Sequence, residues 1–304
     1  MKQEATLYDL IVVGHGPAGV SAAIYAVRSG LKVLLVGRDR GSLEKAEKIE
    51  NYYGFVDPIA GPDLLERGLS QARRLGVEII TTEVTGVTWM EHFEASTTLG
   101  TYQAPACILA TGMPRRKATI PGLTEYEGRG VSYCATCDGF FYRGKKVAVI
   151  GNGEYAFKEA SELAHFASEV TIFTNGRPFE ANGEHPVIKV NLAKVSQAEG
   201  DEDKIRQLVT AEGAIEIDGV FVAEGTASAL DLAYKLGLDN DGKVILTDSD
   251  QQTNIPGLYA AGDCTGGLLQ VAVAVGEGAK AGMSAASYVR NLQGEKAPTV
   301  QWGG

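Results

Sequence analysis

Two cysteines separated by two small residues form the pattern in this chain that is best suited to chemistry. They are Cys134 and Cys137, in the stretch VSYCATCDGFFY that covers residues 131–142. This spacing lets two sulfurs meet within one helical turn or tight loop, close into a disulfide, and reopen when a thiolate attacks. Asp138 follows directly, a carboxylic acid within reach of the sulfur that is displaced or protonated. This pattern makes Cys134, Cys137 and Asp138 candidate catalytic residues of thiol–disulfide exchange.

A C-x-x-C pair taken alone is also compatible with half of a zinc site or with no function. A zinc site needs further ligands at short spacing, typically another Cys or His pair. Only Cys107 and Cys264 remain, each isolated in the sequence, and no H-x-x-x-H occurs. We therefore expect no metal site, and we interpret the two isolated cysteines as structural, with Cys107 packed in a core.

Length and composition describe an ordinary globular protein. The 304 residues are enough for two domains, and 44% are hydrophobic against 22% charged. No apolar run approaches the roughly 20 residues of a membrane span, and the N-terminus lacks a signal-peptide pattern. Four cysteines without secretory context favour a reducing compartment. The sequence predicts a cytoplasmic protein with no membrane partner.

The charge distribution bears on partners. The net charge of −10 argues against nucleic acid. Residues 115–146 nevertheless hold seven basic residues against three acidic ones, a balance of +4 around the cysteine pair. This basic stretch is suited to steering an acidic protein partner, although scattered, solvated side chains would give the same count.

A glycine-rich motif near the N-terminus indicates a nucleotide-binding unit. An apolar strand over residues 8–14 leads into GHGPAG at 14–19, then a helix over 17–29 and a second strand over 31–36. In this βαβ arrangement a pyrophosphate lies at the helix N-terminus, close to the glycine backbone. We predict cofactor contacts from Gly14, Gly16, Pro17, Ala18 and Gly19. The usual acid at the end of the second strand is missing, and Asp39 is the nearest candidate for the adenosine ribose.

The strand–glycine–helix pattern occurs a second time. Residues 146–156 read KVAVIGNGEYA, which contains G-x-G-x-x-A and implies a second nucleotide-type domain. A strong turn signal at 239–242 marks the predicted return to the first domain. A strand over 257–263 then ends at Asp263, which in such a fold can hold a ribityl hydroxyl, and a helix over 269–290 follows.

Together these motifs resemble the low-molecular-weight thioredoxin reductase family. The resemblance rests on G-x-G-P-A-G at 14–19, I-E-N-Y-x-G-F at 49–55, A-T-G at 110–112, C-A-T-C-D-G at 134–139 and A-G-D at 261–263. It implies an α/β fold of two Rossmann-like, three-layer ββα domains, the second inserted in the first. The first domain would comprise residues 1–114 and 245–304 and bind FAD, and the insert, 115–244, would carry the cysteine pair.

The resemblance also implies site residues and partners. FAD contacts would come from the first glycine motif and from Asn51, Ala110, Thr111, Gly112, Gly262 and Asp263. In relatives the cysteine matching Cys137 lies against the flavin, the one matching Cys134 attacks the disulfide of thioredoxin, and the aspartate matching Asp138 is the acid or base. The family further implies a homodimer.

The second glycine motif departs from the family pattern. Members that use NADPH carry small residues after the glycines and then an H-R-R-x-x-x-R type loop. Here Glu154 and Tyr155 follow the glycines, Arg177 alone represents the basic clamp, and the usual I-G-x-x-P stretch is altered at 223–227. We therefore expect an NADPH pocket that does not function, the alternative being a divergent pocket that still works.

This departure points to the pyridine-nucleotide-independent branch of the family. Some of its members take electrons from ferredoxin, and related cyanobacterial forms have less certain donors. We predict a ferredoxin-dependent thioredoxin reductase, with an NADPH-dependent enzyme or a flavin disulfide reductase of unknown donor as alternatives. Trp302 is a candidate to cover the flavin, as a C-terminal aromatic does in some relatives, or else part of a frayed tail.

Two functions from other classes are compatible with parts of the sequence. A ferredoxin–NADP reductase shares the fold but has no C-x-x-C, so the cysteine pair argues against it. A non-enzymatic flavin sensor or scaffold would keep its binding after alkylation of the reduced dithiol, whereas an enzyme would lose turnover.

Overall fold

The computed structural model describes residues 6–38, 41–112, 120–225 and 229–295, with Thr6, Lys45 and Cys137 described by their backbone alone. The chain divides into two compact units, each described by itself below. Unit 1 comprises Met1–Pro114 and Ser228–Gly304, and unit 2 comprises Arg115–Ala227.

Unit 1 is built on a five-stranded parallel sheet of order β17-β8-β2-β3-β4. Its strands are short, and all but the edge strand β4 are fully buried, as expected of apolar strands covered on both faces. They are β2 (Leu10–Val13), β3 (Val33–Gly37), β4 (Glu78–Thr81), β8 (Ala106–Leu109) and β17 (Leu258–Ala260). Val13 pairs with both Val36 and Leu109, so the residues that follow these strands meet at one edge of the sheet.

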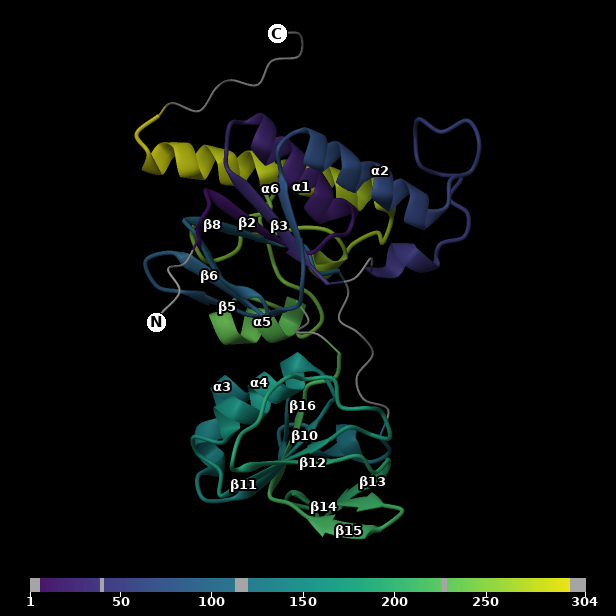
Figure 1. Ribbon diagram of the computed structural model, residues 1–304, viewed down its shortest axis with the longest axis vertical. Helices are drawn as coiled ribbons and strands as arrows, with labels where there is room; N and C mark the ends of the chain where they lie inside the picture. Colours follow the sequence, from purple (N-terminus) through teal and green to yellow (C-terminus); the bar gives the residue numbers. More distant parts are fainter. Residues whose placement is uncertain (1–5, 39–40, 113–119, 226–228, 296–304) are drawn as a thin grey trace. The chain divides into compact units, whose positions relative to one another are not determined.

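Three helices cover one face of this sheet (Figure 1). They are α1 (Pro17–Arg28), α2 (Gly61–Arg74) and α6 (Val271–Leu292). A second sheet of order β1-β7-β6-β5 and the helix α5 (Ala229–Leu236) belong to the same unit. The strands of this sheet are β1 (Thr6–Leu7), β5 (Val84–Trp89), β6 (Phe93–Thr97) and β7 (Gly100–Ala104). Unit 1 thus has the expected three-layer ββα form.

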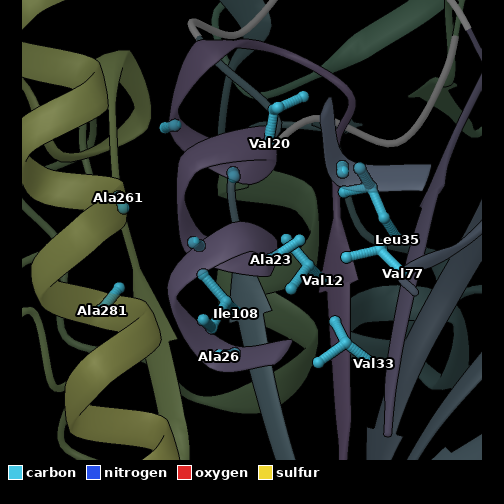
Figure 2. Packing of buried hydrophobic residues seen from close by; sticks show 14 of the residues in the cluster. Val12, Val20, Ala23, Ala26, Val33, Leu35, Val77, Ile108, Ala261 and Ala281 are labelled. Carbon is cyan, nitrogen blue, oxygen red and sulfur yellow. The ribbon is translucent and has the colours of Figure 1, made fainter. Parts of the chain in front are cut away.

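The core of unit 1 joins the two ends of the chain. Ala281 of α6 faces α1, whose Ala23 and Ala26 in turn pack against Val12 and Ile108 of the sheet (Figure 2). Glycines bring the two helices close together, because a Cβ on Gly278 would lie 2.1 Å from the Ala18 carbonyl oxygen. Residues more than 250 positions apart therefore form one hydrophobic core.

Unit 2 repeats the layered plan on a smaller scale. Its parallel sheet has the order β12-β11-β10-β16-β9, and a second sheet has the order β13-β14-β15. The strands of the parallel sheet are β9 (Val131–Ser132), β10 (Lys146–Ile150), β11 (Glu169–Phe173), β12 (Ile188–Asn191) and β16 (Gly219–Val222). Those of the second sheet are β13 (Val195–Gly200), β14 (Ile205–Thr210) and β15 (Gly213–Glu216), and the helices of the unit are α3 (Ala135–Asp138) and α4 (Glu154–Leu163).

Two boundaries differ from the sequence prediction. The chain returns to unit 1 at Ser228, earlier than the predicted 245, because α5 packs against β5 of that unit. The predicted turn at 239–242 therefore lies inside unit 1. The strand expected to end at Asp263 ends at Ala260, and Asp263 begins a short 3-10 turn (Asp263–Thr265).

Candidate functional site

The cysteine pair lies at the end of an edge strand of unit 2. Strand β9 (Val131–Ser132) pairs with β16 and delivers the chain into α3, whose four residues Ala135–Asp138 include Cys137. Cys134 is disulfide-bonded and 4% exposed, whereas Cys107 and Cys264 are free and buried. The side chain of Cys137 lies outside the described residues. The structure thus places Cys134 at a helical turn, the geometry that the spacing predicts.

A serine ties Asp138 to the backbone of the same turn. The Ser132 hydroxyl donates a hydrogen bond to Asp138 Oδ2 at 2.6 Å and accepts one from the Cys134 amide at 3.1 Å. The Asp138 amide donates to the Cys134 carbonyl at 3.1 Å. Asp138 therefore lies within the turn that carries Cys134, as predicted. Sequence reasoning missed Ser132, although a serine two residues before a capped amide is a recognisable turn signal.

A buried glutamate from another element also contacts this turn. Glu159 lies on α4 and is 1% exposed, and its Oε2 accepts a hydrogen bond of 2.9 Å from the Ala135 amide. Sequence reasoning missed it as well. The available signal is its spacing, because it lies four residues after the buried Tyr155 on the apolar face of the helix.

The aromatic residues after the turn divide into two kinds. Tyr142 packs edge-on against Phe221, and burial first, then the charges of Asp138 and Asp218, raise the pKa of its hydroxyl. Phe140 and Phe141 are exposed, with the guanidinium of Arg143 over the Phe140 ring. The turn is therefore followed by an exposed aromatic and basic surface.

The first glycine motif forms an open cradle at the carboxyl edge of the unit 1 sheet. Gly14 has φ +120°, and a Cβ there would lie 2.2 Å from the Ala110 carbonyl oxygen. A Cβ on Gly19 would lie 1.9 Å from the Gly14 carbonyl oxygen, whereas one on Gly16 would meet no described atom within 4 Å. Gly16 is the N-cap of α1, which has no side-chain cap among the described residues. The helix N-terminus thus offers unused amides to a phosphate.

Further polar groups at this edge lack protein partners or carry a shifted pKa. The buried Thr111 Oγ1 has no hydrogen-bond partner among the described residues, and it follows Ala110, which directly succeeds β8. Burial raises the pKa of the Asp263 carboxyl, as expected of an acid that has yet to receive a hydroxyl donor. Gly262 precedes it with φ +83°, and its amide donates to Glu277 Oε2 at 2.8 Å.

These features fit FAD. A phosphate cradle, an orphaned hydroxyl and a partly buried carboxylate at one sheet edge match a dinucleotide that lies across the ends of the strands. Asn51 donates to Gln270 Oε1 at 2.8 Å, which places the 49–55 segment beside the start of α6. Two predicted cofactor contacts, Asp39 and Trp302, lie outside the described residues.

His15 of the first glycine motif occupies the space at the end of β3, where related folds carry an acidic residue. Gly37 ends β3, and a Cβ there would lie 3.0 Å from the His15 amide nitrogen and 3.1 Å from its ring. Arg38 follows and pairs with the buried Glu83 at 3.1 Å. A side chain at position 37 would therefore displace His15.

The second glycine motif is covered by its own chain. The Asn182 amide donates to Glu154 Oε1 at 2.8 Å, and the Glu180 amide donates to the Asn152 carbonyl at 2.7 Å. Asn152 Nδ2 donates to the Pro178 carbonyl at 3.0 Å. We call residues 178–183 the covering segment. It lies against the N-terminus of α4, where a pyrophosphate would lie in the first motif.

The basic clamp expected beside that motif is occupied. Arg177 Nη2 pairs with Glu224 Oε1 at 2.7 Å, and Arg177 Nε donates to the Thr174 carbonyl at 3.3 Å. A Cβ on Gly183 would lie 2.1 Å from the Phe157 ring, so the covering segment packs tightly on α4. The groups that would bind a nucleotide phosphate are engaged within unit 2.

Comparison with known proteins gives the family. Residues 8–278 match the model of the pyridine nucleotide-disulphide oxidoreductase family. The chain belongs to this family. Thioredoxin reductase from Listeria monocytogenes is 35% identical, over 96% of this chain and 97% of its own length. The chain is thus a flavoprotein oxidoreductase of the thioredoxin reductase group, whose cofactor is FAD.

Solved structures agree with this assignment. The atypical thioredoxin reductase TRi from Desulfovibrio vulgaris Hildenborough is similar with a TM-score of 0.88 and 42% identity, covering 93% of this chain and 98% of that one. A ferredoxin-flavin thioredoxin reductase from Clostridium acetobutylicum is similar with a TM-score of 0.69 and 33% identity, covering 96% of this chain and 100% of that one.

Two features are absent from the part of the chain that the structure describes. None of the helices in this part of the chain combines the length and the apolarity needed to cross a membrane. The same residues hold no group of three or more His, Cys, Asp or Glu side chains arranged for a metal ion.

Proposed function

We propose that this protein is a cytoplasmic, homodimeric thioredoxin reductase that takes electrons from ferredoxin rather than from NADPH. Unit 1 would bind FAD, and unit 2 would carry the Cys134–Cys137 pair. The observation that carries the donor assignment is the covering segment, which occupies the N-terminus of α4 with main-chain amides bound to Glu154 and Asn152. NADPH would have to displace this segment and then face the Glu154 carboxylate.

The roles of the residues follow from exchange chemistry. FAD, once bound and reduced by the donor, would supply the two electrons that open a disulfide held against it. The Cys134 sulfur then attacks the disulfide of thioredoxin, forming one S–S bond while the other thioredoxin sulfur leaves and takes a proton. Cys137 attacks Cys134 in turn, so that their S–S bond re-forms and the second thioredoxin thiol is released. Asp138, held by Ser132, would supply and accept the proton.

The charged surface near the turn supports an acidic protein partner. Arg143, Lys145 and Lys146 are exposed and follow the cysteine pair directly. Both thioredoxin and ferredoxin are acidic partners of this kind, so this surface supports either one. Ferredoxin is favoured as the electron donor by two other observations. They are the covering segment and the likeness to a protein named as a ferredoxin-flavin thioredoxin reductase.

Anaerobic reduction of the flavin tests the donor. We expect reduced ferredoxin to bleach the flavin absorbance within seconds, and NADPH and NADH to leave it unchanged. Dithionite serves as the positive control that the flavin is reducible. Rapid bleaching by NADPH would overturn the donor assignment and favour an NADPH enzyme with a divergent pocket. Bleaching by none of the three donors would also overturn it, leaving a disulfide reductase with another electron source.

Cysteine variants test the disulfide chemistry separately. We expect Cys137→Ser to abolish reduction of thioredoxin while FAD stays bound, and Cys134→Ser to trap no mixed disulfide with thioredoxin. Cys264→Ala is the matched control, because this buried thiol lies outside the turn. Undiminished turnover in Cys137→Ser, or a covalent complex joined through another cysteine, would contradict the assigned roles. A protein that shows no thioredoxin turnover, and still binds thioredoxin after alkylation of the dithiol, would favour a flavin scaffold.

A further inference from the structure

The backbone of the cysteine turn is held by two side chains from outside it. The amides of Cys134 and Ala135 open the short helix α3, so neither can bond within the helix. Ser132 Oγ accepts the first hydrogen bond at 3.1 Å, and Glu159 Oε2 accepts the second at 2.9 Å. The peptide that joins Cys134 to the next residue is therefore fixed on both sides.

Burying the Glu159 side chain at this contact costs desolvation free energy. It is 1% exposed, and the other buried residues of α4 are Tyr155 and aliphatic side chains. Burying a carboxylate carries a desolvation cost, and a charge-assisted hydrogen bond to the Ala135 amide offsets part of it. A neutral acceptor such as glutamine could make the same hydrogen bond at lower cost. The charge itself therefore calls for a function.

The position of the charge indicates what it does. The carboxylate lies one hydrogen bond away from the backbone between the two cysteines, in a buried setting where charges are poorly screened. When the disulfide is reduced, any negative charge that forms on Cys134 lies next to the peptide whose amide donates to the Glu159 carboxylate. Like charges at short range disfavour each other, so the carboxylate disfavours the reduced, charged turn.

We propose that Glu159 is a positioning residue that fixes the Cys134–Ala135 peptide for exchange, and that its charge makes the dithiol a stronger reductant. The inference rests on the proposed function of the Cys134–Cys137 pair. Its two parts are separable, because glutamine keeps an acceptor oxygen at the same place without the charge, whereas alanine removes both. Glu162 on the same helix supplies a matched control, since its side chain is partly exposed.

The charge is tested by equilibrating the FAD-loaded protein with oxidised and reduced dithiothreitol. The dithiol passes two electrons and two protons to oxidised dithiothreitol, whose S–S bond opens as the Cys134–Cys137 bond forms. Alkylation and mass spectrometry then give the reduced fraction. In Glu159→Gln we expect the equilibrium to shift about tenfold toward the dithiol, which is about 30 mV for a two-electron couple. Glu162→Gln should not shift it.

The positioning is tested by thioredoxin turnover. We expect Glu159→Ala to lower kcat about tenfold or more at an unchanged KM for thioredoxin, because the sulfur is misplaced while the docking surface is intact. Glu159→Gln should keep kcat within about threefold of the parent protein, because its amide oxygen still accepts the Ala135 hydrogen bond. Unchanged kcat in Glu159→Ala would overturn the positioning role.

Each remaining outcome is decisive. An identical dithiothreitol equilibrium in Glu159→Gln and the parent protein would overturn the charge role, even where Glu159→Ala fails to accumulate as folded flavoprotein. A parent protein whose Cys134 never exchanges with dithiothreitol would overturn the proposed function instead. The equilibrium needs neither thioredoxin nor an electron donor, so it separates the two failures.

Discussion

The two glycine motifs of this chain begin alike and end differently. Both follow a buried parallel strand and open a helix whose N-cap is glycine, Gly16 in unit 1 and Gly153 in unit 2. In unit 1 the helix begins with Pro17 and Ala18, and the space above it is open. In unit 2 it begins with Glu154, whose carboxylate binds the covering segment. The acidic residue at the first helical position thus binds the chain's own backbone where the first motif leaves open space.

The comparison shows that a fingerprint specifies a fold more strongly than a ligand. The glycines are required by close packing in both units, since a Cβ on Gly151 would lie 2.2 Å from the Ala223 carbonyl oxygen, just as one on Gly14 would meet Ala110. This requirement persists whether or not a nucleotide binds. The residues between and after the glycines decide the ligand.

The largest expected effect comes from adding a methyl group at equivalent places in the two motifs. Neither Gly16→Ala nor Gly153→Ala creates a clash with described atoms, so both should fold. Gly16→Ala should weaken FAD binding about 100-fold, because the methyl group fills space near the pyrophosphate and its hydrogen bonds are lost. Gly153→Ala should leave FAD affinity and thioredoxin turnover unchanged. Titration of the flavin-free proteins with FAD measures the FAD affinity of both variants. An equal loss of affinity in the two variants would contradict the difference between the two motifs.

A smaller effect is expected when Glu154 is removed. Glu154→Ala deletes the acceptor of the Asn182 amide, so this amide should exchange with deuterium about tenfold faster, as loss of a charge-assisted hydrogen bond implies. NADPH should still fail to bleach the flavin, since Arg177 stays paired with Glu224 and Gly183 stays packed on Phe157. Rapid bleaching in this variant would show that Glu154 alone closes the site.

The smallest effect concerns the acid of the first site and its dependence on pH. Burial raises the pKa of Asp263, so the folded, flavin-free protein binds a proton more readily there than the unfolded chain does. The stability associated with Asp263 is therefore lost as the pH rises through its folded pKa. At pH 7 the Asp263→Asn variant should have a modestly larger free energy of unfolding than the parent protein. This difference in stability should become small at about pH 3, where the carboxyl is mostly protonated in the folded and in the unfolded chain.

Urea unfolding of the flavin-free proteins at the two pH values measures this difference. With FAD present we expect the order at pH 7 to reverse, because the proposed role of the carboxylate is to accept a hydrogen bond from a ribityl hydroxyl. A variant that is less stable than the parent without flavin would contradict the prediction.

Much of the fold follows from local patterns in the sequence. Both βαβ starts and the long C-terminal helix follow from the sequence, because apolar strands and glycine turns are local signals. The return to unit 1 was placed too late. The turn at 239–242 is a strong local signal, whereas the packing of α5 on β5 joins residues far apart in sequence.

The candidate site divides in the same way. Residue type and spacing alone were enough to predict Cys134, Asp138 and the Gly14–Gly19 motif as candidate site residues. Ser132 and Glu159 do not, because their roles depend on which amide each one meets in the folded chain. The covering segment is likewise invisible in the sequence. Glu154 suggested a damaged pocket, but only the fold reveals what takes the place of the nucleotide.

The joining of distant chain ends in unit 1 has a consequence for biosynthesis. Helix α6 ends at Leu292 and follows unit 2 in the chain, and it packs on α1 through Gly278 and Gly282. A ribosome therefore releases all of unit 2 before the last part of unit 1 emerges. Domains generally fold as units during synthesis, so unit 2 can acquire its structure while α1 still waits for α6. The core that joins α1 to α6 is then completed only after unit 2 has been synthesised.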